Sequence, residues 1–283
     1  MKPQICNYLI LLISLFQIYK CNSDSIVSNL KTEPLTEQQK LELANSQLNS
    51  INSANTFLQQ SPINIQEAVA ANVVKPLNQN ILKINYRTVT GSFVYEPVGK
   101  GNTYKYILPV DDFSHEIAYL DIEKKTTRSY YLRNIHLHVP EEHNIDENMY
   151  PIEFHFVHSL KEAAVEDEYS NLVLGVLGKK SIDTESSKLI SGISFAVGAQ
   201  SQLDMSPLKS LSYYYYHGSL TTPPYSENVL WFVFKDVINV GESLISEAKR
   251  KIGYNARDIQ DLEGEVWIFD NSTKKNLKNQ KAK

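Results

Sequence analysis

The chain has 283 residues, a formal net charge of -4 and a pI near 6.0, and 42% of its residues are hydrophobic. This length and apolar content can supply the core of one globular domain of somewhat more than 200 residues. The charge argues against a nucleic-acid partner, because such proteins need a clustered basic face and no basic stripe appears before the tail of this chain. The sequence does not predict an oligomeric state.

The first 23 residues are typical of a secretory signal peptide. Lys2 lies near the start, and an apolar run follows from Tyr8 to Ile18. This run is shorter than the about 20 residues of a membrane span, so we expect no stable membrane insertion. A lipid anchor at Cys21 is the less favoured alternative, because Lys20 stands where a small residue is usual. We therefore expect a secreted protein, in the periplasm or outside the cell.

The rest of the chain changes composition twice. Cys6 and Cys21 both lie in the predicted signal peptide, so we expect a mature chain without a disulfide. A segment rich in Ser, Asn and Gln comes next, and either a marginal helix or a partly disordered lead-in fits it. The sequence thus predicts a signal peptide (1–23), a polar lead-in (24–59), a folded domain (60–270) and a basic disordered tail (271–283) with a glycosylation sequon at Asn271.

Short strand-like segments recur between turn residues throughout the folded domain. Many strands with few helices indicate a β-rich domain built on a large sheet. We expect strands at 81–86, 92–95, 104–108, 116–122, 130–138, 172–177 and 228–234, and helices at 187–197 and 238–251.

Histidine is concentrated in one part of this domain. The chain has seven histidines, and five of them fall within residues 135–158. His136 and His138 are two residues apart among apolar neighbours, so on a strand both rings project from the same face. The same alternation places Glu153 and His155 together on one face of a second strand-like segment at 150–158. If the two strands are antiparallel neighbours, His155 supplies a third nitrogen to a tetrahedral Zn²⁺ that keeps one open position, and Glu153 can accept from a ligand's second ring nitrogen.

A second motif narrows the chemistry. The segment 216–224 reads YHGSLTTPP, and Trp231 follows Thr221 by ten residues. With the SPINI segment at 61–65 and the histidine strands, this pattern resembles the α-class carbonic anhydrases over roughly residues 60–264. The resemblance implies the α-carbonic anhydrase fold, a mainly β (α+β) single domain around a large twisted, mostly antiparallel central sheet with a few peripheral helices. It also implies a carbonate dehydratase, a zinc lyase that converts carbon dioxide reversibly into bicarbonate and a proton.

The same resemblance assigns the metal site. It implies that His136, His138 and His155 hold Zn²⁺, and that Asn134 and Glu153 bond to the ligand rings from behind. Asn134 stands where the family usually has glutamine, so we expect its shorter amide to reach the His136 ring less well.

The resemblance also assigns the catalytic and substrate-binding residues. It implies that zinc-bound hydroxide attacks carbon dioxide, while the Thr221 hydroxyl accepts a hydrogen bond from that hydroxide and donates to Glu142. Thr222 and the Thr221 backbone N–H would place bicarbonate. An apolar wall would receive carbon dioxide, formed by Val157, Val173 and Leu220.

The chain departs from the family where a proton must leave. The usual Asn-Gly-His segment with its shuttle histidine is missing, and the nearest analogue puts Asn102 at that position. An amide does not titrate near neutral pH, so we expect turnover without the usual histidine shuttle, limited by buffer. His115 and His217 are the remaining candidates for a shuttle. Tyr225 also stands where many secreted relatives have a disulfide cysteine.

Two alternatives remain open at the level of sequence. His136, His138 and Glu142 also fit the front of a cupin motif for iron or manganese, although Tyr130 replaces the expected glycine. A carbonic-anhydrase-like binding or adhesion domain with weak or no turnover is the other alternative. We expect His143 and His158 to be structural in either case.

Overall fold

The computed structural model describes residues 59–66, 74–86, 88–91, 94–98, 101–109, 111–161, 169–196, 199–210, 212–262 and 264–271. All of them belong to the unit that spans residues 57–283. The predicted signal peptide lies outside the described residues, as do the polar lead-in up to residue 58 and the tail beyond residue 271.

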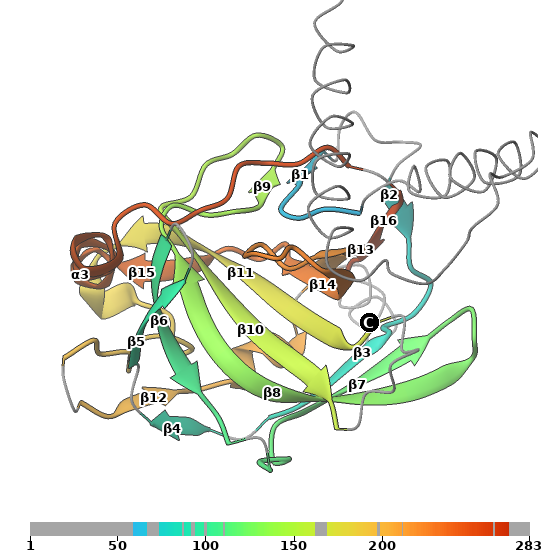
Figure 1. Cartoon of the computed structure of the whole chain (residues 1–283), viewed down its shortest axis with the longest axis horizontal. Coiled ribbons are helices and arrows are strands. Elements are labelled where there is room, and N and C mark those ends of the chain that lie inside the picture. Colours follow the sequence, from blue (N-terminus) through green and yellow to red (C-terminus); the bar gives the residue numbers. More distant parts are fainter. Residues whose placement is uncertain are drawn as a thin grey trace, which may run out of the picture. The chain divides into compact units, whose positions relative to one another are not determined.

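A curled, mixed sheet is the central element of the described part (Figure 1). Its main path follows the order β2-β16-β13-β14-β11-β10-β8-β6-β5, while β15 pairs with β11, and β7 joins β3 to β8. These strands are β2 (Val74–Pro76), β3 (Leu82–Asn85), β5 (Val94–Val98), β6 (Gly101–Ile107), β7 (Glu116–Asp121), β8 (Thr126–His138), β10 (Ile152–Leu160), β11 (Asn171–Ser181), β13 (Tyr213–Ser219), β14 (Glu227–Phe234), β15 (Ile238–Gly241) and β16 (Val266–Phe269).

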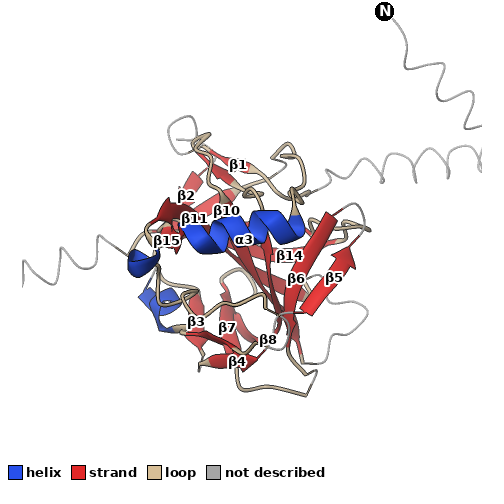
Figure 2. Cartoon of the chain, turned by 90° about the vertical axis from the view of Figure 1, so that its left-hand side faces the viewer, coloured by secondary structure: helices blue, strands red, loops and turns tan. Residues whose placement is uncertain are grey.

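Smaller elements surround this sheet. The strand pairs β1 (Asn64–Ile65) with β9 (Asn144–Ile145) and β4 (Val89–Gly91) with β12 (Ser201–Leu203) form two separate ladders. Helix α3 (Glu242–Ile252) packs against β15, β6 and β11 and lies across the sheet in Figure 2. Two short 3₁₀ turns complete the set, η1 (Asp183–Glu185) and η2 (Ser206–Ser210). No helix among the described residues is long and apolar enough to cross a bilayer.

Most neighbouring strands of the large sheet are antiparallel, which agrees with the prediction. The parallel pairs are β11 with β14, β11 with β15, and β16 with β2. Strand β11 is buried continuously from Leu172 to Gly178. A strand covered on both faces has no polar face to alternate with, which is why its sequence is an unbroken apolar run.

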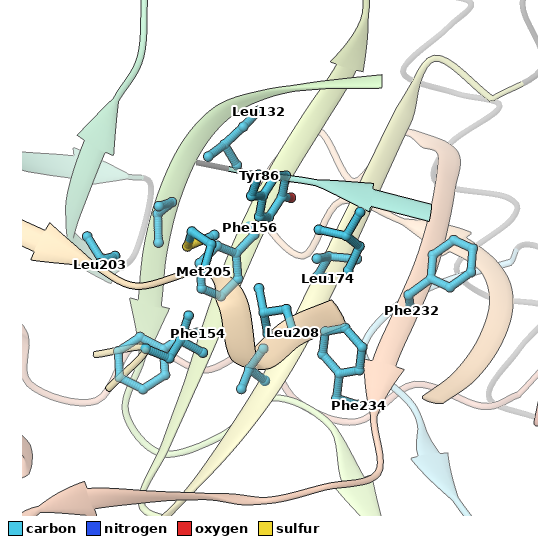
Figure 3. Close-up of a cluster of buried hydrophobic side chains, with 14 of the residues drawn as sticks. Tyr86, Leu132, Phe154, Phe156, Leu174, Leu203, Met205, Leu208, Phe232 and Phe234 are labelled. Carbon is cyan, nitrogen blue, oxygen red and sulfur yellow. The ribbon is translucent and has the colours of Figure 1, made fainter. Parts of the chain in front are cut away.

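Hydrophobic residues pack on both faces of the sheet. On one face, Phe154 and Phe156 of β10 join the larger core cluster with Leu174, Phe232 and Phe234 (Figure 3). Each fully buried side chain of this size contributes about 1.5–3 kcal/mol of hydrophobic stabilisation. The other face carries a smaller cluster built from Val173, Tyr214, Tyr216, Trp231, Val233 and their neighbours. Because residues alternate along β10, its intervening side chains turn toward this second cluster.

The two predicted helices turned out differently from expectation. Residues 187–196 contain no helix but a turn at 188–191, with hydrogen bonds from Ile190 N–H to Ser187 O and from Ile193 N–H to Ile190 O. Gly192 bridges to Gln202, and a Cβ on Gly192 would come within 2.1 Å of the Gln202 carbonyl oxygen. This close tertiary contact overrides the helical spacing of the sequence. The second predicted helix begins as strand β15, and α3 starts only at Glu242.

Candidate metal centre

The rigid frame of the site is the antiparallel pair β8 and β10. His155 lies directly opposite His136, and Glu153 lies opposite His138. The ring centroids of the three histidines are 4.6 to 5.2 Å apart. Their candidate ligand atoms all lie within 4.8 Å of one another, which is close enough to hold one metal ion.

Each of the three rings is oriented by an oxygen on its far side. His136 Nδ1 donates to Asn134 Oδ1 at 2.8 Å, and His155 Nε2 donates to Glu153 Oε1 at 3.0 Å. His138 Nδ1 donates to the Asn255 carbonyl oxygen at 3.4 Å. A neutral imidazole that donates through one nitrogen has a lone pair on the other. The lone pairs are therefore on Nε2 of His136, Nε2 of His138 and Nδ1 of His155.

These hydrogen bonds correct the expectation about Asn134. Its side chain is shorter than glutamine, but its Oδ1 reaches His136 Nδ1 at a normal hydrogen-bond distance of 2.8 Å. Both residues lie on β8 and face the same way, so two residues of strand separation bring the short amide close enough.

The three histidines fit a metal ion. Nε2 of His138 is buried and has no hydrogen-bond partner among the described residues. Burial lowers the pKa of His136, His138 and His155 below the ordinary value, which keeps the rings neutral. Neutral rings aimed at a common point are what zinc requires, and three nitrogen donors with an open fourth position are the pattern of catalytic zinc sites. The group contains His155 and not Glu142, which disfavours the cupin alternative.

A second group, His143, Glu153 and His155, is also close enough to hold an ion, but its atoms are already paired. Glu153 Oε1 accepts from His143 Nδ1 at 2.8 Å and from His155 Nε2, while its Oε2 accepts the backbone N–H groups of Glu142 and His143, each at 2.8 Å. His143 Nε2 accepts from the Tyr216 hydroxyl at 2.7 Å. This group is therefore a saturated hydrogen-bond network that supports the ligand His155.

The network also fixes the charge of Glu153. Burial by itself raises the pKa of this carboxyl, but His143 and His155 together hold it well below the ordinary value. The chain of bonds continues from Tyr216 to Ser61 Oγ at 2.8 Å and from Ser219 N–H to Ser61 Oγ at 3.1 Å. Side chains far apart in sequence are thus bonded behind the histidine cluster.

Glu142 and Thr221 lie next to the cluster. Glu142 is buried, and its Oε1 accepts the Arg257 backbone N–H at 2.9 Å and lies 3.2 Å from His138 Nδ1. Burial raises the pKa of Glu142 well above the ordinary value, while the Thr221 side chain and the Arg257 N–H act in the opposite direction. The carboxyl and the hydroxyl are therefore neighbours, although they are 79 residues apart in the sequence.

A cavity of about 340 Å³ opens onto His136, His138 and Thr221. Its lining includes His136, His138, Thr221 and Thr222, and also Lys105. We expected an apolar wall formed by Val157, Val173 and Leu220, but none of these residues lines this cavity. All three belong to the smaller core cluster, which also contains Trp231. Trp231 packs against His155 with ring centroids 4.9 Å apart, so this cluster directly adjoins the metal ligands.

The sequence did not point to three other residues that position the site. Asn255 accepts the Val139 N–H on its Oδ1 at 2.8 Å and donates to Leu137 O at 3.2 Å, so it fixes the end of β8. Arg257 supplies the N–H that Glu142 accepts. A Cβ on Gly175 would come within 2.7 Å of Glu153 Oε1, so only glycine leaves room for this carboxylate. A local pattern gives no signal for any of them.

The remaining histidines do not line the cavity. His217 lies between the hydroxyls of Tyr169 and Tyr215, at 2.7 and 2.6 Å. His115 Nδ1 lies 2.9 Å from Ser114 Oγ, and His158 donates from Nδ1 to Leu172 O at 3.0 Å. The backbone of Asn102 is part of β6, but its side chain lies outside the described residues.

Comparisons with known proteins agree with this geometry. The family model described as eukaryotic-type carbonic anhydrase matches residues 45–269. A carbonic anhydrase of Neisseria gonorrhoeae is 29% identical over 219 residues, which cover 74% of this chain and 76% of that protein. The human mitochondrial carbonic anhydrase 5A is 29% identical over 251 residues, which cover 76% and 77% of the two chains. The solved α-carbonic anhydrase of Aspergillus oryzae is similar with a TM-score of 0.56 and 26% identity, over 74% of this chain and 84% of the other.

Proposed function

The chain belongs to the eukaryotic-type carbonic anhydrase family, and we propose that it catalyses the reversible hydration of carbon dioxide with a zinc ion held by His136, His138 and His155. Membership of the family supports carbonate dehydratase activity in general. The observation that carries the zinc assignment is the convergence of three neutral ring nitrogens, one of which is buried with no hydrogen-bond partner in the part of the chain that the structure describes.

A zinc ion bound there supplies a Lewis acid that lowers the pKa of a coordinated water to about 7, a value known from carbonic anhydrases themselves and not from this structure. The residues of this chain then have three tasks. They orient the attacking oxygen, hold carbon dioxide in an apolar environment and bind bicarbonate until it leaves.

Orientation is assigned to Thr221 and Glu142. In the proposal the Thr221 hydroxyl donates a hydrogen bond to a carboxyl oxygen of Glu142, and Glu142 is itself fixed by the Arg257 N–H at 2.9 Å. The Thr221 oxygen is then left as an acceptor only, so it selects the direction from which the attacking oxygen donates. Holding one geometry in advance is a recognised source of rate acceleration.

Substrate and product are assigned to two neighbouring surfaces. Carbon dioxide is assigned to the side of His155 on which Val157, Val173 and Leu220 pack beside Trp231, although none of the three lines the 340 Å³ cavity. These uncharged side chains suit carbon dioxide because it has no net dipole. Thr222, together with the Thr221 backbone N–H, would bind bicarbonate, and both residues line the cavity.

A binding domain of the same fold without turnover is the competing function. We expect such a domain to lack at least one of the three histidines, whereas this chain has all of them in a common cluster. Metal analysis of the purified chain and its activity together separate the two functions.

The decisive experiment replaces one ligand. His138→Ala should lose bound zinc and reduce carbon dioxide hydration to the level of the uncatalysed reaction, and a strong chelator should do the same to the wild type. His217→Ala is the matched control, because this histidine is bonded to tyrosines away from the cavity, and it should keep its zinc. Hydration that survives both the chelator and His138→Ala would refute the proposal.

We further propose that the chain is exported, as its apolar N-terminal segment suggests. Expression in a host with an intact secretory pathway should yield a mature protein that begins near residue 24. A protein that keeps Met1 and remains in the cytoplasm would contradict this proposal.

A further inference from the structure

A second cavity, also of about 340 Å³, lies next to the first one. Both cavities are lined by Tyr254, Ala256, Arg257 and Asp258. The segment 254–258 is therefore a wall that the two cavities share. The remaining lining of the second cavity comes from Ile259 and from the loop that follows β8, including Glu141 and Met149.

Two buried carboxyl groups line this second cavity, Glu141 and Glu142, and Glu142 is already fixed by the Arg257 N–H and lies beside His138. Glu141 is the one that is not part of the metal centre. Glu141 is only 6% exposed, and its Oε2 has no hydrogen-bond partner among the described residues. Burial raises the pKa of this carboxyl, although the N–H groups of Tyr150 and of Glu141 itself act in the opposite direction. A buried carboxylate oxygen without a donor is unfavourable, so the position favours a ligand that brings a donor and a positive charge.

The charged residues that line the cavity do not supply a donor to Glu141 Oε2. Arg257 packs on the Tyr225 ring at 3.8 Å and donates to Ser61 O at 2.6 Å, so its guanidinium is engaged there. Asp258, another carboxylate in the lining, is exposed. The cavity thus combines three carboxyl groups, the buried Glu141 and Glu142 and the exposed Asp258.

Three large side chains of the lining are apolar and accessible. Met149 is 79% exposed, Tyr254 is 71% exposed and Ile259 is 42% exposed. Large apolar side chains that gather around a cavity mark a binding surface more often than scattered ones do. A ligand that fits both the buried Glu141 carboxyl and the apolar side chains has a cationic N–H donor at one end and a hydrocarbon stem at the other.

We propose that this cavity binds a small primary alkylamine in its ammonium form, with the ammonium group on Glu141 and the stem against Met149, Tyr254 and Ile259. The ammonium supplies the donor that Glu141 Oε2 lacks, and an ionic hydrogen bond of this kind is stronger than a neutral one. Because the segment 254–258 also carries the Asn255 and Arg257 contacts to His138 and Glu142, the amine binds beside the groups that position the metal centre.

Titration calorimetry of the zinc-loaded full chain with n-hexylamine at pH 7 tests this site. Glu141→Gln keeps the shape of the side chain and removes its charge, so the amine should bind about tenfold more weakly or worse. Glu147→Gln, which removes an equal charge from the same loop outside the cavity, should bind the amine like the wild type. n-Hexyltrimethylammonium, which has no N–H donor, should also bind weakly to the wild type.

Equal binding by Glu141→Gln and the wild type would overturn the proposal, because the amine would then be held elsewhere, the metal included. The absence of saturable binding to the wild type would overturn it as well. Met149→Ala gives an independent test if Glu141→Gln does not fold, since Met149 is at the surface. In this variant the gain in affinity from butylamine to hexylamine should shrink, and an unchanged gain would contradict the assigned position of the stem.

Discussion

The histidines of this chain differ in how many of their two ring nitrogens are bonded to protein groups. In a metal ligand one nitrogen is free for the metal, and the other donates to an oxygen of the protein. In the three proposed ligands this donating nitrogen meets a carbonyl or carboxylate oxygen, so the opposite nitrogen keeps its lone pair. In His143 and His217 both ring nitrogens are bonded to protein groups. This difference in partners separates the proposed ligands from their neighbours more sharply than sequence position does.

The proton released by hydration must leave the cavity, and the residues available to carry it allow a prediction. His136 and His138 are the only histidines among the described residues that line the cavity, and both are committed to the metal. We therefore expect the hydration rate to rise with buffer concentration in stopped-flow measurements. His217→Ala should behave like the wild type at every buffer concentration, because His217 lies away from the cavity. A fast rate that does not depend on buffer would contradict the prediction.

The sequence revealed the three histidines because strand alternation is a local rule. Two residues of separation suffice to place His136 and His138 on one face, and the register of β10 then brings His155 opposite. Asn255 contacts His138 across 117 positions of the chain, and nothing in its own neighbourhood of the sequence indicates that role. Such contacts depend on the tertiary fold and could not be predicted from the pattern.

At the scale of elements, strand β11 limits what can stand behind the ligands. Gly175 lies opposite His155 in the register of β10 and β11. The Glu153 carboxylate fills the space beside Gly175, and its four hydrogen bonds leave it no freedom to move. The Glu153 carboxylate can therefore lie where it orients His155 only because position 175 of β11 is glycine.

Gly175→Ala should therefore weaken zinc binding. The added methyl displaces Glu153 from His155, and loss of such a partner typically costs 10–100-fold in metal affinity. Gly178→Ala is the matched control on the same strand, because its methyl would crowd Val240 and Ile152 instead. Both variants should melt at a lower temperature than the wild type, but only Gly175→Ala should show a raised zinc dissociation constant in a chelator competition. Equal zinc affinities of the two variants would contradict this role of Gly175.

The elements themselves were predictable to different degrees. Strands β7, β8 and β14 match their expected positions because each has an apolar face or run of its own. Residues 187–196 were expected to be a helix, since their apolar spacing is helical and the close approach of Gly192 to Gln202 is visible only in the fold. Strand β15 was missed for a related reason, because Ile238–Gly241 is strand only through its parallel pairing with β11.

At the scale of the whole molecule, the domain buries many ionisable groups next to its two hydrophobic clusters. His138, His143, His155 and His158 are all at most 2% exposed. The first three belong to the metal centre or its network. His158 instead faces the larger cluster, where its Nδ1 donates to the Leu172 carbonyl oxygen at 3.0 Å and its Nε2 accepts from the Tyr86 hydroxyl. Burial lowers the pKa of His138, His155 and His158, so charging them is unfavourable in the folded state and the stability of the domain is linked to pH.

His158 allows this linkage to be tested. Burial lowers the pKa of His158 from 6.5 to about 3. Between these two pH values the unfolded chain binds a proton that the folded chain does not, so the free energy of unfolding falls as the pH falls and the loss is complete near pH 3. At 1.36 kcal/mol per pKa unit the loss from this residue has an upper limit of roughly 5 kcal/mol. His158→Gln cannot take up the proton.

We expect His158→Gln to be less stable than the wild type at pH 7, because it loses the imidazole that donates to the Leu172 carbonyl oxygen and accepts from the Tyr86 hydroxyl. The difference between the two proteins should shrink as the pH falls from 6.5 toward 4 in urea unfolding of the metal-free chains. Metal-free chains are required because zinc release in acid would add its own pH dependence to the comparison. A difference that stays constant over this range would mean that His158 is already protonated in the folded state, or that it remains neutral in both states, and would contradict the lowered pKa.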